Sequence, residues 1–357
     1  MSVSTPSMSV SSLVTGEHDA TSQAVLAARR KAFRALHERG CFVIPNPWDV
    51  GSARYLQHLG FPALATTSAG YAFSQGLPDS GDAVVISRDR SLAYIASITA
   101  AVDLPVSADF MAGYGRKAED VAESVVQCVA TGVAGLSIED STGDPNSPLY
   151  ELPIAIERVR AARQAIDRSG QDVLLTARAE CYHVGHPDPL RESVRRLQAY
   201  AAAGADVLFA PGPQNPADIE ALVQAVAPKP LNLLVVRDIG LSVGDLAALG
   251  VRRISVGGAL ALAAWTGFMR AAQSLKSEGS FAGLASLVPY AEINGLFATD
   301  FAAHQAQGLV AQGTDGIRQE AAQVGGFWPV GDECGRSEGL DPDNVGDIAD
   351  EGPGHRG

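Results

Sequence analysis

The chain has 357 residues, of which 46% are hydrophobic and 19% charged, with a formal net charge of -13. This length is enough for one large α/β barrel or two smaller domains, and the composition is typical of a globular protein with a sizeable core. The acidic balance argues against nucleic acid as a partner, because phosphate binding needs a basic face. No apolar stretch approaches the roughly 20 residues of a membrane helix, so we expect no membrane partner. Four separated cysteines without a CxxC pair fit a reducing cytoplasm and indicate neither a zinc ribbon nor a disulfide framework.

The two ends of the chain differ in composition from its middle. Residues 1–22 are rich in Ser and Thr and lack periodicity, which predicts a disordered leader. Residues 331–357 are rich in Gly, Asp, Glu and Pro, which predicts an acidic disordered tail. The folded domain is therefore expected over residues 23–330.

Short apolar runs alternate with helical patterns through this domain. Runs of this length are typical of strands buried on both faces. Glycines such as Gly132 and Gly250 follow predicted helices, where a left-handed cap is expected. Eight such units predict a (β/α)8 TIM barrel rather than a doubly wound sheet, since no GxGxxG motif follows the first strand. The predicted strands are 41–46, 63–68, 105–110, 135–140, 173–179, 206–211, 231–236 and 253–257.

Three of the predicted strands end in charged residues. Asp109 ends the third, Glu139 and Asp140 end the fourth, and Arg178 and Glu180 end the fifth. The carboxyl ends of barrel strands form the active-site face. Carboxylates there can hold a hard divalent cation, and an arginine beside them can bind a substrate carboxylate. The sequence therefore predicts a metal and carboxylate site at this end of the barrel.

These residues also have plainer interpretations. Asp109 could cap the next helix. Successive side chains on a strand point to opposite sides, so only one residue of the Glu139–Asp140 pair can face the site. We predict that Glu139 does so and that Asp140 makes loop or cap hydrogen bonds. Arg178 could pair with Glu180, which shares its face, and still bind a substrate.

Other residues are expected near the same face. The segment 66–70 offers hydroxyl and backbone donors to an anion, and Asp79 follows it in a turn. Trp48 ends the first strand and could line the pocket, with a core position nearly as plausible. His183 and His186 follow the fifth strand without a third ligand at zinc spacing, so a solvated loop is the better interpretation for both.

Taken together, these motifs resemble the phosphoenolpyruvate mutase/isocitrate lyase superfamily. The resemblance covers roughly residues 30 to 300 and includes the order and spacing of the motifs. The motifs that carry it are 77–79 (LPD), 107–115 (SADFMAGYG), 132–140 (GVAGLSIED), 177–180 (ARAE), 201–206 (AAAGAD) and 290–297 (YAEINGLF).

The resemblance implies a barrel with a magnesium site, for which Mn²⁺ is the alternative ion. Asp109 would be the direct metal ligand, while Asp79 and Glu139 would hold metal-bound waters. Arg178 would contact the carboxylate of the substrate and act in catalysis with Asp79 and Glu139. The family's chemistry passes through an enolate of a 2-oxo acid or a metaphosphate-like group. Backbone amides of Thr67, Ser68 and Ala69 would complete the carboxylate site.

Two departures from the family pattern bear on specificity. Met111 stands where many members have a second acid. Residues 141–150 (STGDPNSPLY) replace the Lys-Lys/Arg-Cys-Gly-His loop of isocitrate and methylisocitrate lyases, so the cysteine acid of those enzymes is missing. Cleavage of isocitrate is therefore not expected.

We expect a magnesium-dependent lyase or decarboxylase acting on a small 2-oxo or 2-hydroxy (di)carboxylate through an enolate. The alternatives are a phosphonate P–C mutase or hydrolase, and a barrel that binds a carboxylate without turnover. Apolar helical sequence after the eighth strand, from about residue 259 to 312, exceeds what closing the barrel requires and predicts a homodimer or homotetramer. The resemblance implies that subunits exchange their last barrel helix.

Overall fold

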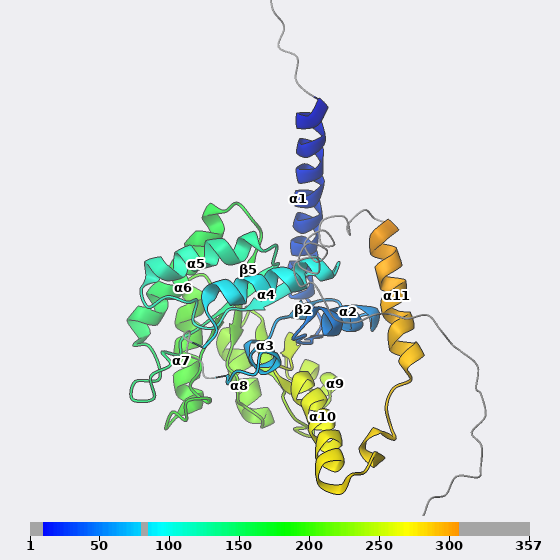
Figure 1. Ribbon diagram of the computed structural model, residues 1–357. Coiled ribbons are helices and arrows are strands. Elements are labelled where there is room, and N and C mark those ends of the chain that lie inside the picture. The colour runs from blue at the N-terminus through cyan, green and yellow to red at the C-terminus, as the bar shows by residue number, and fades with distance from the viewer. Residues whose placement is uncertain (1–9, 80–84, 307–357) are drawn as a thin grey trace, which may run out of the picture. The chain divides into compact units, whose positions relative to one another are not determined.

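The computed structural model describes residues 10–79 and 85–306. Its eight strands pair in parallel in the order β1-β8-β7-β6-β5-β4-β3-β2 (Figure 1). This arrangement confirms the predicted (β/α)8 barrel, and each predicted strand contains one observed strand. The strands are β1 (Phe42–Ile44), β2 (Leu64–Ala65), β3 (Val106–Asp109), β4 (Gly135–Glu139), β5 (Leu174–Arg178), β6 (Val207–Phe209), β7 (Leu231–Leu234) and β8 (Arg253–Ser255).

The barrel closes between β1 and β2 through contacts just beyond β1. The Ala65 amide donates to the Pro45 carbonyl at 3.0 Å. The Asn46 side chain donates to the Thr66 carbonyl at 2.9 Å and accepts from the Val256 and Gly257 amides after β8. One buried asparagine therefore connects the carboxyl ends of the first, second and eighth strands.

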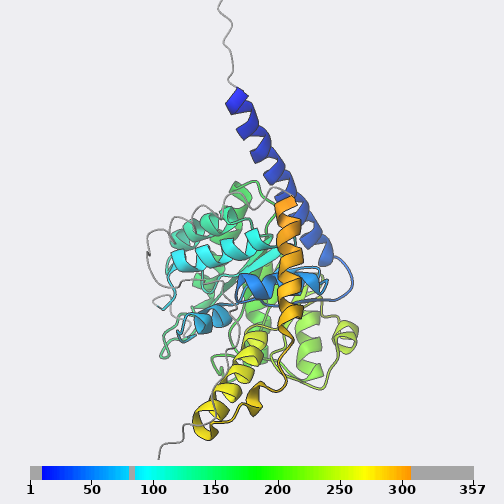
Figure 2. The ribbon, with the colours of Figure 1, turned by 45° about the vertical axis from the view of Figure 1, so that its right-hand side comes forward.

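Helices lie outside the strands, as both views show from α4 to α8 (Figures 1 and 2). Among the described residues none of the helices has the length and apolar character needed to cross a membrane. The helices are α1 (Val10–Leu36), α2 (Val50–His58), α3 (Ser68–Ser74), α4 (Arg88–Ala101), α5 (Ala118–Ala130), α6 (Leu152–Arg168), α7 (Pro189–Ala202), α8 (Pro216–Val226), α9 (Val243–Ala248), α10 (Ala259–Glu278), the 3₁₀ turn η1 (Ala282–Leu284) and α11 (Tyr290–Ala306).

Local signals explain where several of these elements begin and end. Asp49 caps α2 by accepting from the Ser52 amide at 2.7 Å. Gly132 and Gly250 follow helices with φ of 88° and 91°, as expected for left-handed caps. β2 is shorter than predicted because Thr67 accepts from the Gly70 amide and begins α3, so Ser68 is helical.

The amino end of the barrel is closed by the last turns of α1. Phe33 is fully buried there, and a Cβ added to Gly135 of β4 would lie only 2.8 Å from its ring. Helix α1 begins at Val10, so residues 10–22 are helical where the sequence predicted a disordered leader. No proline interrupts 10–36, so the helical pattern of its second half extends toward the N-terminus. Residues 1–9 and the predicted acidic tail, 331–357, lie outside the described residues.

The barrel interior contains a buried arginine from β8. The Arg253 guanidinium donates to Asn232 Oδ1 at 2.8 Å and to Thr176 Oγ1 at 3.0 Å, and lies 3.4 Å from His37 Nε2. The other ring nitrogen of His37, Nδ1, lies 2.8 Å from the Phe33 carbonyl. Burial and the nearby Arg253 charge lower the pKa of His37 to about 3, so its imidazole is neutral and Nδ1 carries the proton.

His37 should make the protein acid-sensitive. Its pKa is lowered from 6.5 to about 3, so between these values the unfolded chain binds a proton that the folded chain does not. Stability is therefore lost as the pH falls, by roughly 2–3 kcal/mol at pH 4.5 from this group. We expect His37→Gln to be less stable than wild type at pH 7.5 but to lose less on acidification, measured by urea unfolding at both pH values. His58→Gln, on the surface, is the control, and an unchanged pH loss in His37→Gln would contradict this origin.

The chain after β8 is helical, as predicted. Helix α10 packs on α3, where a Cβ added to Gly70 would lie 3.3 Å from Ala261 Cβ. The chain divides into two compact units, Met1–Leu296 and Phe297–Gly357, with the boundary inside α11. Large apolar side chains of α10 are exposed, among them Leu262, Trp265, Phe268 and Met269.

Candidate active site

The strand ends bring three predicted site residues together. Asp109, Glu139 and Arg178 end β3, β4 and β5, and Glu139 and Arg178 are register partners. Arg178 Nη1 lies 3.3 Å from Glu139 Oε2 and 3.8 Å from Asp109 Oδ1. The carboxylate and arginine cluster at the carboxyl ends of the strands is therefore formed as the sequence predicted.

Arg178 is held by further groups. Its Nε forms an ion pair with Glu180, and its guanidinium lies over the Phe209 ring at 5.1 Å. Its side chain is 14% exposed. The pairing of Arg178 with Glu180 that the sequence allowed is present, and substrate binding by Arg178 stays a prediction.

Glu139 and Asp140 point to different environments. Asp140 accepts from the Tyr200 hydroxyl at 2.5 Å and the Glu180 amide at 2.9 Å, and pairs with Arg196 at 3.0 Å. These contacts place Asp140 in a buried network between β4 and α7. Strand alternation therefore gave the correct assignment for this residue, a structural role outside the cluster.

Burial strongly affects the charges of the two glutamates. Burial raises the pKa of Glu139 to about 8; Arg178 opposes the shift, and Glu180, Asp109 and Asp140 reinforce it. Burial also acts to raise the pKa of Glu180, but Arg178 and His183 outweigh it and hold that pKa below its usual range. An additional cation beside Glu139 would favour its ionised form.

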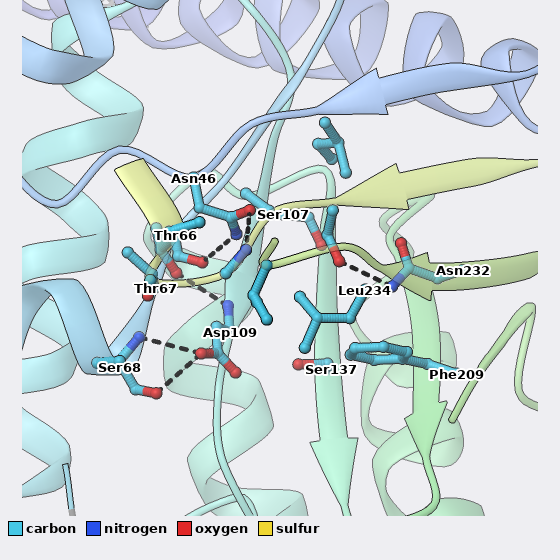
Figure 3. A pocket seen from close by; sticks show the side chains of 18 of the residues that line it. Asn46, Thr66, Thr67, Ser68, Ser107, Asp109, Ser137, Phe209, Asn232 and Leu234 are labelled. Atoms are coloured by element: carbon cyan, nitrogen blue, oxygen red, sulfur yellow. Dashed lines mark hydrogen bonds between the residues drawn. The ribbon is translucent and has the colours of Figure 1, made fainter. Parts of the chain in front are cut away.

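A cavity of about 350 Å³ opens beside this cluster. Asp109, Ser137 and Asn232 point into it from separate strands (Figure 3). Asp79 and His183 line it as well. Asp79 is exposed at its rim, where desolvation and the Asp109 charge raise its pKa.

His183 lies on the exposed turn after β5, as the sequence favoured, and it also lines the cavity. Its Nδ1 is 3.0 Å from Glu180 Oε2, and its side chain is 61% exposed. Glu180 thus joins His183 to Arg178. The spacing of Glu180 and His183 on the turn after β5 was the available signal, because residues three apart in a turn can meet.

The segment Thr67–Ala69 lines the cavity, but two of its amides are already bonded. The Ser68 amide and hydroxyl both donate to Asp109 Oδ2, at 3.0 and 2.9 Å (Figure 3). The Thr67 amide lies 3.3 Å from the Tyr94 hydroxyl. In this structure Ser68 therefore positions Asp109, a contact that the sequence did not indicate.

Trp48 is not among the residues that line this cavity in the described chain. After Pro47 the backbone turns into α2, and the Trp48 amide donates to Ser52 Oγ at 3.1 Å. A Cβ added to Gly70 would lie 2.9 Å from Trp48 Cβ, so this residue packs against α3. Trp48 therefore packs against a neighbouring helix and does not line the described pocket. The sequence had left a packing role open as the alternative.

The two departures from the family pattern, Met111 and residues 141–150, are both described by the structure. Met111 is buried, has φ of 49° and accepts from the Tyr114 hydroxyl through its sulfur at 3.3 Å. Residues 141–150 form a turn closed on itself, in which Thr142 Oγ1 donates to the Ser147 carbonyl at 2.5 Å. This turn contributes nothing to the described cavity lining.

The oxygen donors are of the kind that a hard cation binds, but they are not arranged as a complete metal site. Asp109, Glu139 and Asp79 supply carboxylate oxygens, the ligands that Mg²⁺ prefers. Within 10–79 and 85–306, no group of three or more His, Cys, Asp or Glu side chains is assembled at metal-binding range. Asp109 Oδ2 already accepts two bonds from Ser68, so Oδ1 is its freer oxygen.

A parallel eight-stranded barrel with acids and an arginine at the carboxyl ends of neighbouring strands is the architecture of a barrel enzyme that acts at that face. Residues 33–276 match the family model for phosphoenolpyruvate phosphomutase. The chain therefore belongs to the phosphoenolpyruvate mutase/isocitrate lyase superfamily.

Three similar proteins illustrate the range of this superfamily. A crystal structure of a candidate lyase/mutase from Burkholderia cenocepacia J2315 is 46% identical, with a TM-score of 0.73, covering 77% of this chain and 97% of that one. The 2-methylisocitrate lyase of Escherichia coli K12 is 33% identical over 50% of this chain and 60% of the relative. The oxaloacetate decarboxylase of Paraburkholderia xenovorans LB400 is 30% identical over 56% and 66%.

Proposed function

We propose that this protein is a magnesium-dependent lyase that cleaves a carbon–carbon bond, by decarboxylation or aldol-type cleavage, in a small 2-oxo or 2-hydroxy (di)carboxylate. The observation that carries the proposal is the cluster of Asp109, Glu139 and Arg178 within 4 Å beside a small cavity. The names of the relatives support C–C cleavage but do not assign a substrate to this chain.

The proposed roles of the site residues follow from their charges. Asp109 and Glu139 would hold Mg²⁺ with Asp79 near the rim; Mg²⁺ would supply positive charge where negative charge develops on the enolate oxygen. Once these acids are compensated, the Arg178 Nη1 group that now faces them is available to orient a substrate carboxylate.

His183 is the best-placed group for proton transfer. Glu180 fixes its Nδ1, which leaves Nε2 for the cavity. In a decarboxylation, the C–C bond breaks, CO₂ leaves and the electron pair stays on the enolate, whose carbon then takes a proton. Histidine commonly donates such a proton near neutral pH.

The test is a substrate comparison with Mg²⁺ present. We expect oxaloacetate to give pyruvate and CO₂ faster than the uncatalysed reaction, with EDTA removing the activity. Phosphonopyruvate is the second arm, because the matched family model describes a phosphomutase. Turnover of phosphonopyruvate alone would replace the proposal with P–C chemistry, and binding without turnover of any tested acid would favour the carboxylate-binding barrel.

Isocitrate and 2-methylisocitrate should be poor substrates. Residues 141–150 hold no cysteine, histidine or lysine and lie outside the described cavity lining. Loss of a general acid typically costs 10²–10⁴-fold, so we expect cleavage at least about 100-fold slower than that of the preferred substrate. Glyoxylate and pyruvate release would be followed by coupled assays. Efficient release of either product would show that another group supplies the acid.

We also propose that the protein is a homodimer or homotetramer assembled through α10 and the segment after it. Phe268 is 61% exposed and Tyr290 83%, which is unusual for such large apolar side chains. We expect Phe268→Lys to lower the molar mass measured by light scattering at micromolar concentration, whereas Val126→Lys, an exposed apolar position on α5, should leave it unchanged. A monomeric wild-type protein would refute the proposal.

A further inference from the structure

Arg253 is a buried cation without an acidic partner among the described residues. Its three contacts are with Asn232, Thr176 and His37, and the imidazole is neutral. Burial alone accounts for its lowered pKa of about 9, which still leaves it charged at neutral pH. A charged side chain that is 4% exposed normally has a counter-charge, because burying an unpaired ion costs several kcal/mol.

The surroundings of Arg253 are polar where a barrel core is ordinarily aliphatic. Interior layers of such barrels are dominated by Val, Ile and Leu. Here the cavity-lining residues on the strands include Ser107, Ser137 and Asn232 (Figure 3). Ser255 lines the cavity as well. Asn232 binds Arg253 through its oxygen and Ser255 through its amide group, so it orients the guanidinium. Packing alone does not require this composition.

The same cavity reaches both arginines. Arg178 and Arg253 each line it, together with Asp109. Arg178 is surrounded by three carboxylates, whereas Arg253 has neutral acceptors only. A guanidinium carries five N–H donors, and the three contacts of Arg253 leave donors for another acceptor. The uncompensated positive charge of the cavity therefore lies in the barrel interior, beneath the acidic cluster.

We propose that Arg253, oriented by Asn232, forms a second anion subsite that binds the distal carboxylate of a short dicarboxylate whose other end is held at the Asp109–Arg178 cluster. The substrate class is then a dicarboxylate rather than a monocarboxylate. This inference rests on the proposed function for the position of the first carboxylate. The missing counter-charge of Arg253 would come from the ligand, through charge-assisted hydrogen bonds.

The test compares two four-carbon acids that differ at one end, succinate and butyrate, by calorimetry with Mg²⁺ present. Wild type should bind succinate at least about tenfold more tightly than butyrate, since a charge-assisted contact is worth roughly 1.5–3 kcal/mol. Arg253→Met should remove this difference and leave butyrate binding within about twofold. Arg253→Lys, which keeps the charge, should retain part of the preference. The proposal would be overturned if Arg253→Met lost affinity equally for succinate and butyrate. It would also be overturned if the variant kept the full preference for succinate.

Two controls test whether Arg253→Met has a folding defect and whether the site binds free inorganic anions. Because an unpaired buried charge is removed, Arg253→Met should unfold at a temperature no lower than that of wild type, and a large decrease would assign Arg253 a structural role instead. Chloride at the same concentration should not displace succinate; competitive displacement would indicate a site for a free inorganic anion and would also overturn the proposal. The readout is binding, so failure of oxaloacetate to react would count against the proposed function and leave the subsite standing.

Discussion

Replacing Asp109 with asparagine should reduce Mg²⁺-dependent turnover by about a thousandfold or more and leave the barrel folded. Asp109 ends β3 at the cavity, and its Oδ1 faces Arg178 while Oδ2 accepts two hydrogen bonds from Ser68. Asparagine can still accept the Ser68 bonds, so the local fold is kept, but it lacks the charge that holds a divalent cation.

Two measurements separate metal binding from folding in this variant. Calorimetric titration with Mg²⁺ should show binding to wild type and none to Asp109→Asn, while thermal unfolding without Mg²⁺ should differ little between them. Asp172→Asn is the matched control, because Asp172 pairs with Arg34 at the surface, away from the cavity. Wild-type turnover of Asp109→Asn at saturating substrate would remove the metal mechanism.

The sequence predicted the barrel well because its signals are local. Each strand is a short apolar run, and glycines such as Gly132 and Gly250 mark the preceding helix ends where only a left-handed residue fits. The same locality explains the main differences. The cap at Thr67 ends β2 early, and α1 extends into residues that composition alone assigned to a leader.

The site was predictable only as far as strand ends and side-chain alternation reach. These rules gave the Asp109, Glu139 and Arg178 cluster and the outward position of Asp140. Strand ends and alternation could not predict the polar contacts deeper in the barrel. Asn46 connects three strand ends and Arg253 reaches Thr176 across the barrel, contacts that depend on closure and register between distant segments. A charged residue inside a predicted interior strand was the one sequence signal for Arg253.

Replacing Arg178 with glutamine should be the most destabilising single change at the site. Arg178 is the cation that faces Asp109, Glu139 and Glu180, and its removal leaves three closely spaced carboxylates in a buried cluster. Removing one partner of a buried ion pair typically costs about 3–5 kcal/mol. For a protein of this size that corresponds to a decrease of roughly 4–8 °C in the unfolding temperature.

Magnesium should partly reverse this loss, since a divalent cation beside the same acids replaces the missing positive charge. We expect Arg178→Gln to gain more unfolding temperature from added Mg²⁺ than wild type does, and the double variant with Asp109→Asn to lose that gain. Arg34→Gln, which removes partly exposed ion pairs with Asp172 and Asp206, should cost less, because such pairs are worth about 0–1 kcal/mol each. Scanning calorimetry without and with Mg²⁺ decides between the outcomes. An Arg178→Gln protein as stable as wild type without Mg²⁺ would mean that the three acids share protons rather than depend on the arginine.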